Sequence, residues 1–123
     1  MNKILFLVIG LLIISNILLW FHAIPTGDFK SSVFIYKGIF PKENSEHVKD
    51  LEFSFVHIDV DIHDSVKECL EFFVPRMIAS GIIVMDDYNA PTCNGAKIAA
   101  DDFCKLNQLV IEPTVQCQAV IRF

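Results

Sequence analysis

Basic residues are few in this sequence, and they are not clustered. The 123 residues include 10 Lys and Arg against 15 Asp and Glu, which gives a formal net charge of -5 at pH 7. A surface that follows a nucleic-acid backbone needs clustered Lys and Arg. The composition therefore predicts no nucleic-acid partner and favours a polar small molecule or a metal ion.

Cysteine motifs are also lacking. The 4 cysteines form no C-x-x-C pair and stand at no ligand-like spacing from a histidine, whereas such spacings are typical of zinc sites. We therefore expect no zinc and free thiols, as in a reducing compartment. The alternative is a secreted, disulfide-bonded domain. The cysteines are Cys69, Cys93, Cys104 and Cys117.

One long hydrophobic run is present near the N-terminus. Residues 4–21 are almost entirely apolar, and their number is close to the roughly 20 residues that a membrane-spanning helix needs. We expect a transmembrane or signal-anchor helix over residues 1–24, a linker over 25–32 and one small α/β domain over 33–123.

This run predicts a single-pass membrane protein. Lys3 on one side and Lys30 and Lys37 on the other are too evenly balanced to set its orientation, and we expect the domain to be cytoplasmic. A cleaved signal peptide fits less well because its cut site needs small residues, and Ala23 stands alone before Ile24 and Pro25. Trp20 and Phe21 fit an aromatic position at the membrane interface. The alternative is that the run is an accident of a truncated or misassembled reading frame.

Beyond the run, the hydrophobic pattern alternates between strands and helices. Continuous apolar segments rich in β-branched and aromatic residues predict buried strands, and apolar spacings of three and four predict amphipathic helices. The order β, β, α, β, α, β, β predicts an α/β layer with an antiparallel end. The predicted strands cover residues 33–36, 53–60, 82–85, 110–111 and 118–123, and the predicted helices cover 64–78, with Asp64 or Ser65 as N-cap, and 95–106.

Acidic residues follow two of these strands, at the point where each strand ends. Asp59 and Asp61 stand at the end of the first, and Asp86 and Asp87 come directly after the second. The carboxyl ends of adjacent parallel strands meet at one edge of a sheet, where ligands collect. Four carboxylates close together are costly unless a cation or shared protons compensate them. Oxygen ligands favour Mg²⁺, Mn²⁺ or Ca²⁺ over zinc; the alternative is that one Asp of each pair caps a helix and the other faces water.

Ordered sequence blocks over about residues 30–123 resemble the macrocin O-methyltransferase family. The blocks are Tyr36–Pro41, Phe55–Asp61, Leu70–Phe73 with Pro75–Arg76, Gly81–Val84 with Asp86–Tyr88, Gly95–Lys97 and Asp101–Phe103. Two positions depart from the family pattern: Ser80 replaces the first residue of a Gly-Gly pair, and Val74 replaces an aromatic residue.

The resemblance implies a class I methyltransferase that passes a methyl group from S-adenosylmethionine to a hydroxyl group of a small molecule, typically a sugar, with help from Mg²⁺. It implies that Asp59, Asp86 and Asp87 bind the metal, and that Asp61 is a catalytic residue near the acceptor. An alcohol is a poor nucleophile until its proton is removed, and a bound cation makes that removal easier.

Two histidines are candidates to take that proton by their location. His57 lies inside the strand predicted at 53–60, where the alternative is a hydrogen-bonded core histidine. His63 stands where the family usually has Tyr, so the resemblance implies no role for it.

The resemblance covers the C-terminal half of such an enzyme only. Class I methyltransferases hold the cofactor through their first strand, its glycine-rich loop and the acid after the second strand. This sequence has no G-x-G pattern, so we assign no cofactor-binding residue. We expect a partial Rossmann-like class I methyltransferase sheet that lacks these first strands and follows an N-terminal apolar helix. The strand at 53–60 would then have a bare edge, which invites a second copy or a partner chain.

These observations leave several functions open. One is a metal-assisted, S-adenosylmethionine-dependent O-methyltransferase. Another is a non-catalytic, membrane-anchored remnant of such an enzyme that binds a metal or a partner but no cofactor. The last is a degenerate gene product without a stable fold.

Overall fold

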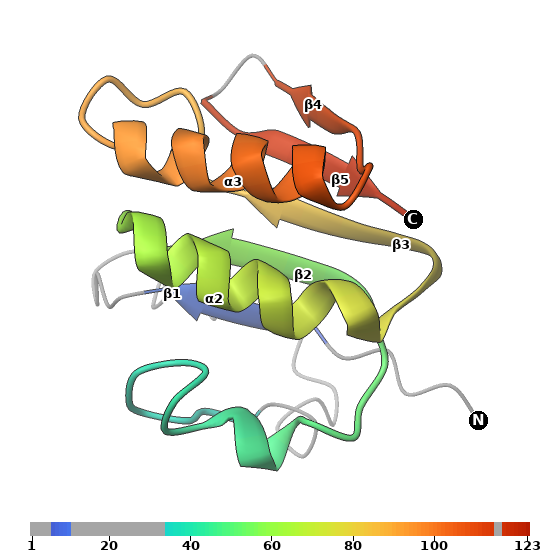
Figure 1. Ribbon diagram of the computed structural model, residues 1–123. Coiled ribbons are helices and arrows are strands. Elements are labelled where there is room, and N and C mark those ends of the chain that lie inside the picture. Colours follow the sequence, from blue (N-terminus) through green and yellow to red (C-terminus); the bar gives the residue numbers. More distant parts are fainter. Residues whose placement is uncertain (1–5, 11–33, 115–116) are drawn as a thin grey trace, which may run out of the picture.

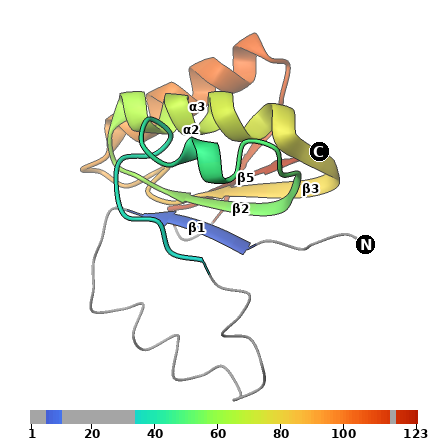
Figure 2. The same cartoon turned by 90° about the horizontal axis from the view of Figure 1, so that it is seen from below.

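The protein forms one five-stranded sheet with two helices packed on one of its faces (Figures 1 and 2). The computed structural model describes residues 6–10, 34–114 and 117–123. The strands are β1 (Phe6–Gly10), β2 (Phe53–Asp59), β3 (Met77–Met85), β4 (Ile111–Pro113) and β5 (Ala119–Arg122), and the helices are α2 (His63–Phe73) and α3 (Asn94–Leu106), with short 3-10 helices η2 (Ser45–His47) and η3 (Val74–Arg76).

The strand order is β1-β2-β3-β5-β4. β1, β2 and β3 run parallel, whereas β5 pairs antiparallel with both β3 and β4. The predicted α/β layer with an antiparallel end is therefore present. The two strands predicted at 110–111 and 118–123 are also present, as the antiparallel pair β4 and β5. In Figure 2, α2 and α3 lie on the same side of the sheet.

β2 and α2 form where the hydrophobic pattern predicted them. Val66, Leu70 and Phe73 lie on the buried side of α2, at the spacing of one helical face. α2 ends at Phe73, short of the predicted end at residue 78, because the ring of Pro75 cannot continue the helix. The chain passes into η3, and Met77 and Ile78 already belong to β3. The predicted N-cap is wrong, because the cap residue is Ile62 and makes no side-chain hydrogen bond.

Aromatic rings connect the segment before β2 to this core. The ring of Phe40 stacks on that of Phe73 with centroids 5.0 Å apart, and Phe53 meets Phe73 edge to face at 5.1 Å. Such aromatic pairs add to the stabilisation that comes from area burial alone. The segment from Phe40 to Val48 therefore packs on the same face of the sheet as α2.

The prediction of a strand over residues 33–36 is wrong for its described part. Phe34–Tyr36 form no strand and are exposed, with Ile35 at 83%. Val33 lies outside the described residues. A strand needs a neighbour, and the free edge of β2 is already taken by β1.

β1 corrects the expectation of an N-terminal helix. Phe6–Gly10 pair in parallel with β2, from Phe6 opposite Phe55 to Gly10 opposite Asp59. A short apolar run without alternation is compatible with a buried helix or a strand, so periodicity could not separate them. The bare edge predicted beside β2 is covered by β1.

The remainder of the predicted anchor, residues 1–5 and 11–24, and the predicted linker at 25–32 lie outside the described residues. Within the part of the chain that the structure describes, no helix has the length and apolar character needed to cross a membrane.

Candidate metal centre

The carboxyl ends of β2 and β3 lie side by side and place the predicted acids together. Asp59 is the last residue of β2, and Asp86 and Asp87 directly follow β3. Ile58 pairs with Met85, and the backbone N–H of Asp86 donates to the carbonyl of Ile58 across 2.8 Å. This hydrogen bond joins the two strand ends directly beside the carboxylates.

Three carboxylates meet at this edge. Asp59, Asp86 and Asp87 each offer one carboxylate oxygen, and the three oxygens lie within 4.8 Å of one another. Two donors hold the central carboxylate: the backbone N–H of Asp87 reaches Asp86 Oδ1 at 3.1 Å, and the side-chain amide of Gln118 reaches the same oxygen at 3.2 Å. The predicted convergence of these acids is therefore present in the structure.

The surroundings of Asp59 and Asp87 disfavour their charged forms. Burial raises the pKa of Asp59, and the nearby carboxylate of Asp86 adds to the rise. Burial also raises the pKa of Asp87, as do its hydrogen bond with Asp61 and the neighbouring carboxylates. Among the described residues, no Lys or Arg forms an ion pair with any of them.

This donor set fits a hard divalent cation. Oxygen atoms are the ligands that Mg²⁺ prefers, and a cation would remove the repulsion that raises these pKa values. Mg²⁺ is commonly held by one or two carboxylates together with water and substrate, so three available carboxylates are sufficient.

Asp61 lies at the exposed rim of the cluster. It contributes to the raised pKa of Asp87. Asp61, Asp87 and Cys93 form a second group whose ligand atoms lie within 4.8 Å of one another. Sequence reasoning placed Asp61 here but not Cys93, which was assigned only as a free thiol. All four cysteines are free thiols in the structure.

His57 lies within β2, two residues before Asp59. Val56 and Ile58 are buried, at 0% and 1% exposure, and side chains alternate along a strand, so His57 shares a face with Asp59. Its buried Nε2 atom has no hydrogen-bond partner among the described residues. The alternative prediction for His57 was a hydrogen-bonded core histidine. The described residues provide no such hydrogen bond at Nε2.

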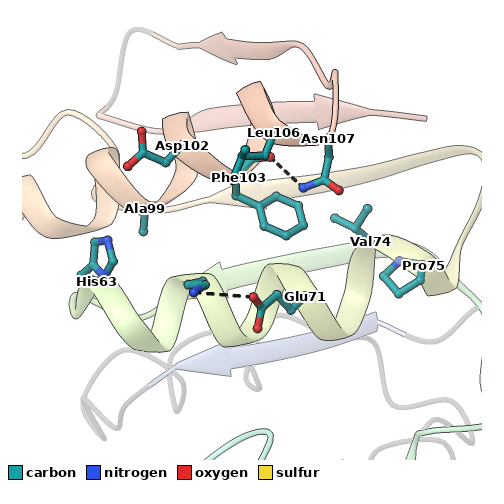
Figure 3. Close-up of a pocket in the computed structure, with 10 residues that line it drawn as sticks. His63, Glu71, Val74, Pro75, Ala99, Asp102, Phe103, Leu106 and Asn107 are labelled. Carbon is teal, nitrogen blue, oxygen red and sulfur yellow. Dashed lines mark hydrogen bonds and ion pairs between the residues drawn. The ribbon is translucent and has the colours of Figure 1, made fainter.

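His63 does not join the carboxylates. Its Nδ1 lies 2.8 Å from Asp64 Oδ1 at the start of α2. His63 also lines a groove of about 580 Å³ between α2 and α3, on the outer side of the helices (Figure 3). The side chains at the other end of that groove, Leu106 and Asn107, belong to the last turn of α3 and its cap.

A family model described as Macrocin-O-methyltransferase (TylF) matches residues 27–120. The chain belongs to this family. The resemblance stated from the sequence blocks is thereby confirmed.

Solved structures of O-methyltransferases share the fold. The O-methyltransferase NovP is 18% identical with a TM-score of 0.52, and the match covers 58% of this chain and 29% of NovP. The apo structure of CalS11, described as a TDP-rhamnose 3'-O-methyltransferase of calicheamicin biosynthesis, is 21% identical with a TM-score of 0.54 over 68% of this chain and 36% of CalS11. A second CalS11 structure gives the same TM-score and identity over 79% of this chain and 35% of CalS11.

The matched part of this chain thus spans about a third of the length of these structures. No curated protein matches the chain.

β1 lies along the edge of β2 that the sequence predicted to be bare. This strand occupies the position beside β2 that the first strands of class I methyltransferases were expected to fill, and Gly10 ends it opposite Asp59. The glycine-rich loop of such enzymes follows that strand, but residues 11–33 lie outside the described residues and the sequence has no G-x-G pattern. The described residues therefore assign no cradle for S-adenosylmethionine.

Proposed function

We propose that this chain binds a divalent cation, Mg²⁺ in the first place, through Asp59, Asp86 and Asp87, and that it serves methyl transfer from S-adenosylmethionine to a hydroxyl group of a sugar-type small molecule. The observation that carries this proposal is the trio of carboxylate oxygens within 4.8 Å, at adjacent strand ends in a member of an O-methyltransferase family. Ligands of open α/β sheets collect at this edge.

We assign the role of each residue from its position. A divalent cation at this edge would lower the pKa of the acceptor hydroxyl and orient it for in-line attack. Asp59, Asp86 and Asp87 supply the oxygen ligands. Asp61 is exposed and its carboxylate lies within 4.8 Å of that of Asp87, so it can take the proton from the hydroxyl group of a substrate at the rim.

His57 is the second candidate to accept a proton. It shares a strand face with Asp59, and its Nε2 has no partner among the described residues. His57 lies inside β2, about 7 Å along the strand from Asp59, which is the rise of two residues. It is therefore farther than Asp61 from an acceptor molecule at the rim. We therefore assign the larger role to Asp61.

A second function is favoured by the length of the match. The chain matches 29% to 36% of the solved methyltransferases, and it lacks a glycine-rich pattern. A metal-binding module without methyl transfer would keep the carboxylates and bind no cofactor. Binding of S-adenosylmethionine separates the two functions.

Titration calorimetry on the full chain tests both proposals. Residues 1–26 must be kept, because β1 pairs along β2. Mg²⁺ is titrated first, and S-adenosylmethionine is then added at millimolar concentration. Heat in both steps supports the methyltransferase; heat from Mg²⁺ alone supports the metal-binding module.

Matched variants assign the heat to the site. Asp86→Asn removes the charge of the central carboxylate, whereas Asp50→Asn removes one exposed charge in the loop before β2. We expect the first to abolish Mg²⁺ binding and the second to leave it unchanged. Absence of Mg²⁺ binding by the unmodified chain would rule out the metal centre.

A further inference from the structure

Tyr88 connects the metal centre to α3. It follows Asp87 directly and is 3% exposed. Its hydroxyl group donates to Oδ1 of Asp101 and accepts a hydrogen bond from Nζ of Lys97 at 3.0 Å. Lys97 Nζ also lies 2.5 Å from Asp101 Oδ2 and 4.5 Å from the centroid of the Tyr88 ring.

α3 offers this pair of partners as a fixed unit. Lys97 and Asp101 are four residues apart, so they stand on the same face of the helix, one turn from each other. The neighbouring Ala96 and Ala100 are both 0% exposed, which holds this side of α3 against the sheet. The hydroxyl of Tyr88 therefore meets a donor and an acceptor whose positions are set by the helix.

The backbone beside Tyr88 needs such an anchor. Asp87 has a φ of 54°, a left-handed conformation that disfavours most residues other than glycine and that Asp and Asn adopt more readily than the rest. This conformation reverses the chain directly after β3 and aims two successive carboxylates at the same edge. Backbone hydrogen bonds from Ala90 to Asp87 and from Asn89 to Cys117 hold this turn, and the buried Tyr88 side chain adds an anchor on α3 directly beside Asp87.

We infer that Tyr88, Lys97 and Asp101 are positioning residues of the metal centre. They do not touch the cation or the acceptor; they fix the backbone at Asp87 so that its carboxylate stays within reach of Asp59 and Asp86. This inference rests on the proposed function, because it requires that the three carboxylates bind a cation.

A purely structural role predicts something different. If Tyr88 only filled the core, loss of its hydroxyl would change thermal stability but not the geometry of a bound cation. Groups that orient metal ligands typically change the affinity for the metal by roughly 10-fold to 100-fold when they are removed. The affinity and the spectrum of a bound ion therefore distinguish the two roles.

Mn²⁺ is the probe, because it reports both quantities by electron paramagnetic resonance and accepts the oxygen ligands that suit Mg²⁺. Tyr88→Phe in the full chain removes the hydroxyl and keeps the ring. We expect roughly tenfold weaker Mn²⁺ binding and an altered spectrum of the bound ion. Tyr36→Phe is the matched control, since Tyr36 stacks on His47 in the segment before β2, and we expect it to bind Mn²⁺ like the unmodified chain.

Changes on α3 give a second test that does not disturb the core. Asp101→Asn weakens the acceptor of the Tyr88 hydroxyl, whereas Asp102→Asn changes its exposed neighbour. Lys97→Met removes the ammonium group and keeps an aliphatic side chain, whereas Lys97→Arg keeps a positively charged hydrogen-bond donor. We expect Asp101→Asn and Lys97→Met to weaken Mn²⁺ binding, Lys97→Arg to recover part of it, and Asp102→Asn to have no effect.

The outcomes separate this inference from the function on which it rests. If the unmodified chain binds Mn²⁺ and Tyr88→Phe and Asp101→Asn bind it with the same affinity and spectrum, the positioning role is overturned and the metal centre stands. If the unmodified chain does not bind Mn²⁺, the metal centre and the positioning role both fall.

Discussion

At the scale of single residues, the metal centre lowers the stability of the metal-free protein, because the fold disfavours the charged forms of Asp59 and Asp87. The pKa of Asp59 is raised by burial and then by Asp86, from an ordinary value of 3.8. A carboxyl group whose pKa is raised in the folded state binds its proton more tightly there than in the unfolded chain. The free energy of unfolding of the metal-free protein therefore falls as pH rises from about 3.8 through the raised pKa.

Asp59→Asn should accordingly stabilise the metal-free protein at pH 7 and abolish Mg²⁺ binding. The gain should disappear at a pH below the ordinary carboxyl pKa, where Asp59 is protonated in both states. Thermal melts with a chelator at the two pH values measure it, with Asp50→Asn as the exposed control. A lower melting temperature for Asp59→Asn at pH 7 would contradict the electrostatic account.

The cysteines differ in reactivity because they differ in burial. Burial raises the pKa of Cys69 to about 12 and that of Cys104 to about 11, whereas Cys117 is exposed. Since the thiolate is the reactive form, we expect N-ethylmaleimide at pH 7.5 to modify Cys117 quickly and to leave Cys69 and Cys104 intact until the chain unfolds. Peptide mass spectrometry gives the order of modification, and Cys117→Ser should remove the fast phase.

The carboxylates of the site could be predicted from the sequence, but the groups that hold them could not. Asp59, Asp86 and Asp87 follow strands that are visible as apolar runs, and the geometry of parallel sheets brings strand ends together. The orientation of the Tyr88 side chain depends on the left-handed backbone conformation at Asp87, and no sequence pattern predicts that conformation. Gln118 reaches Asp86 through the register of an antiparallel pair, and register is set by turns and packing.

At the scale of elements, β1 is where sequence and structure differ most. Its five residues belong to an apolar run long enough to span a membrane, and hydropathy alone does not distinguish such a run from a buried parallel strand. Phe6–Gly10 form a strand because they pair with the edge of β2, which lies far along the chain. α2, α3 and the second half of β3 were predictable because each is defined by its own local pattern, whereas the start of β3 at Met77 and Ile78 was assigned to the preceding helix.

Removal of β1 should therefore cost a large part of the stability. Each backbone hydrogen bond of the β1–β2 pair contributes roughly 1 kcal/mol net, and a small domain has only about 5–15 kcal/mol in total. We expect a chain without residues 1–10 to melt at a lower temperature and to form aggregates through the exposed edge of β2. Size-exclusion chromatography and thermal melts measure both effects.

A shorter deletion serves as the control for this experiment. A chain without residues 2–5 keeps all of Phe6–Gly10 and so keeps the pairing with β2. It should remain monodisperse and melt close to the unmodified chain. Equal behaviour of the two deletions would mean that β1 does not support the sheet.

At the scale of the whole molecule, the metal centre joins parts of the chain that are far apart in sequence. Its carboxylates come from the ends of β2 and β3, Gln118 holds one of them from the start of β5, and Tyr88 ties the same turn to α3. A cation bound to Asp59, Asp86 and Asp87 therefore binds the folded chain and has no equivalent site in the unfolded one. Binding that is confined to the folded state stabilises the whole fold.

Mg²⁺ should raise the melting temperature for this reason. At a concentration about tenfold above the dissociation constant, the gain is roughly 1.4 kcal/mol, which corresponds to about 5–10 °C for a domain of this size. The melt is compared with one in NaCl of equal ionic strength, because screening alone also relieves repulsion between carboxylates. If NaCl raises the melting temperature equally, or if the rise with Mg²⁺ persists in Asp86→Asn, the effect comes from general screening of the carboxylates and not from a specifically bound ion.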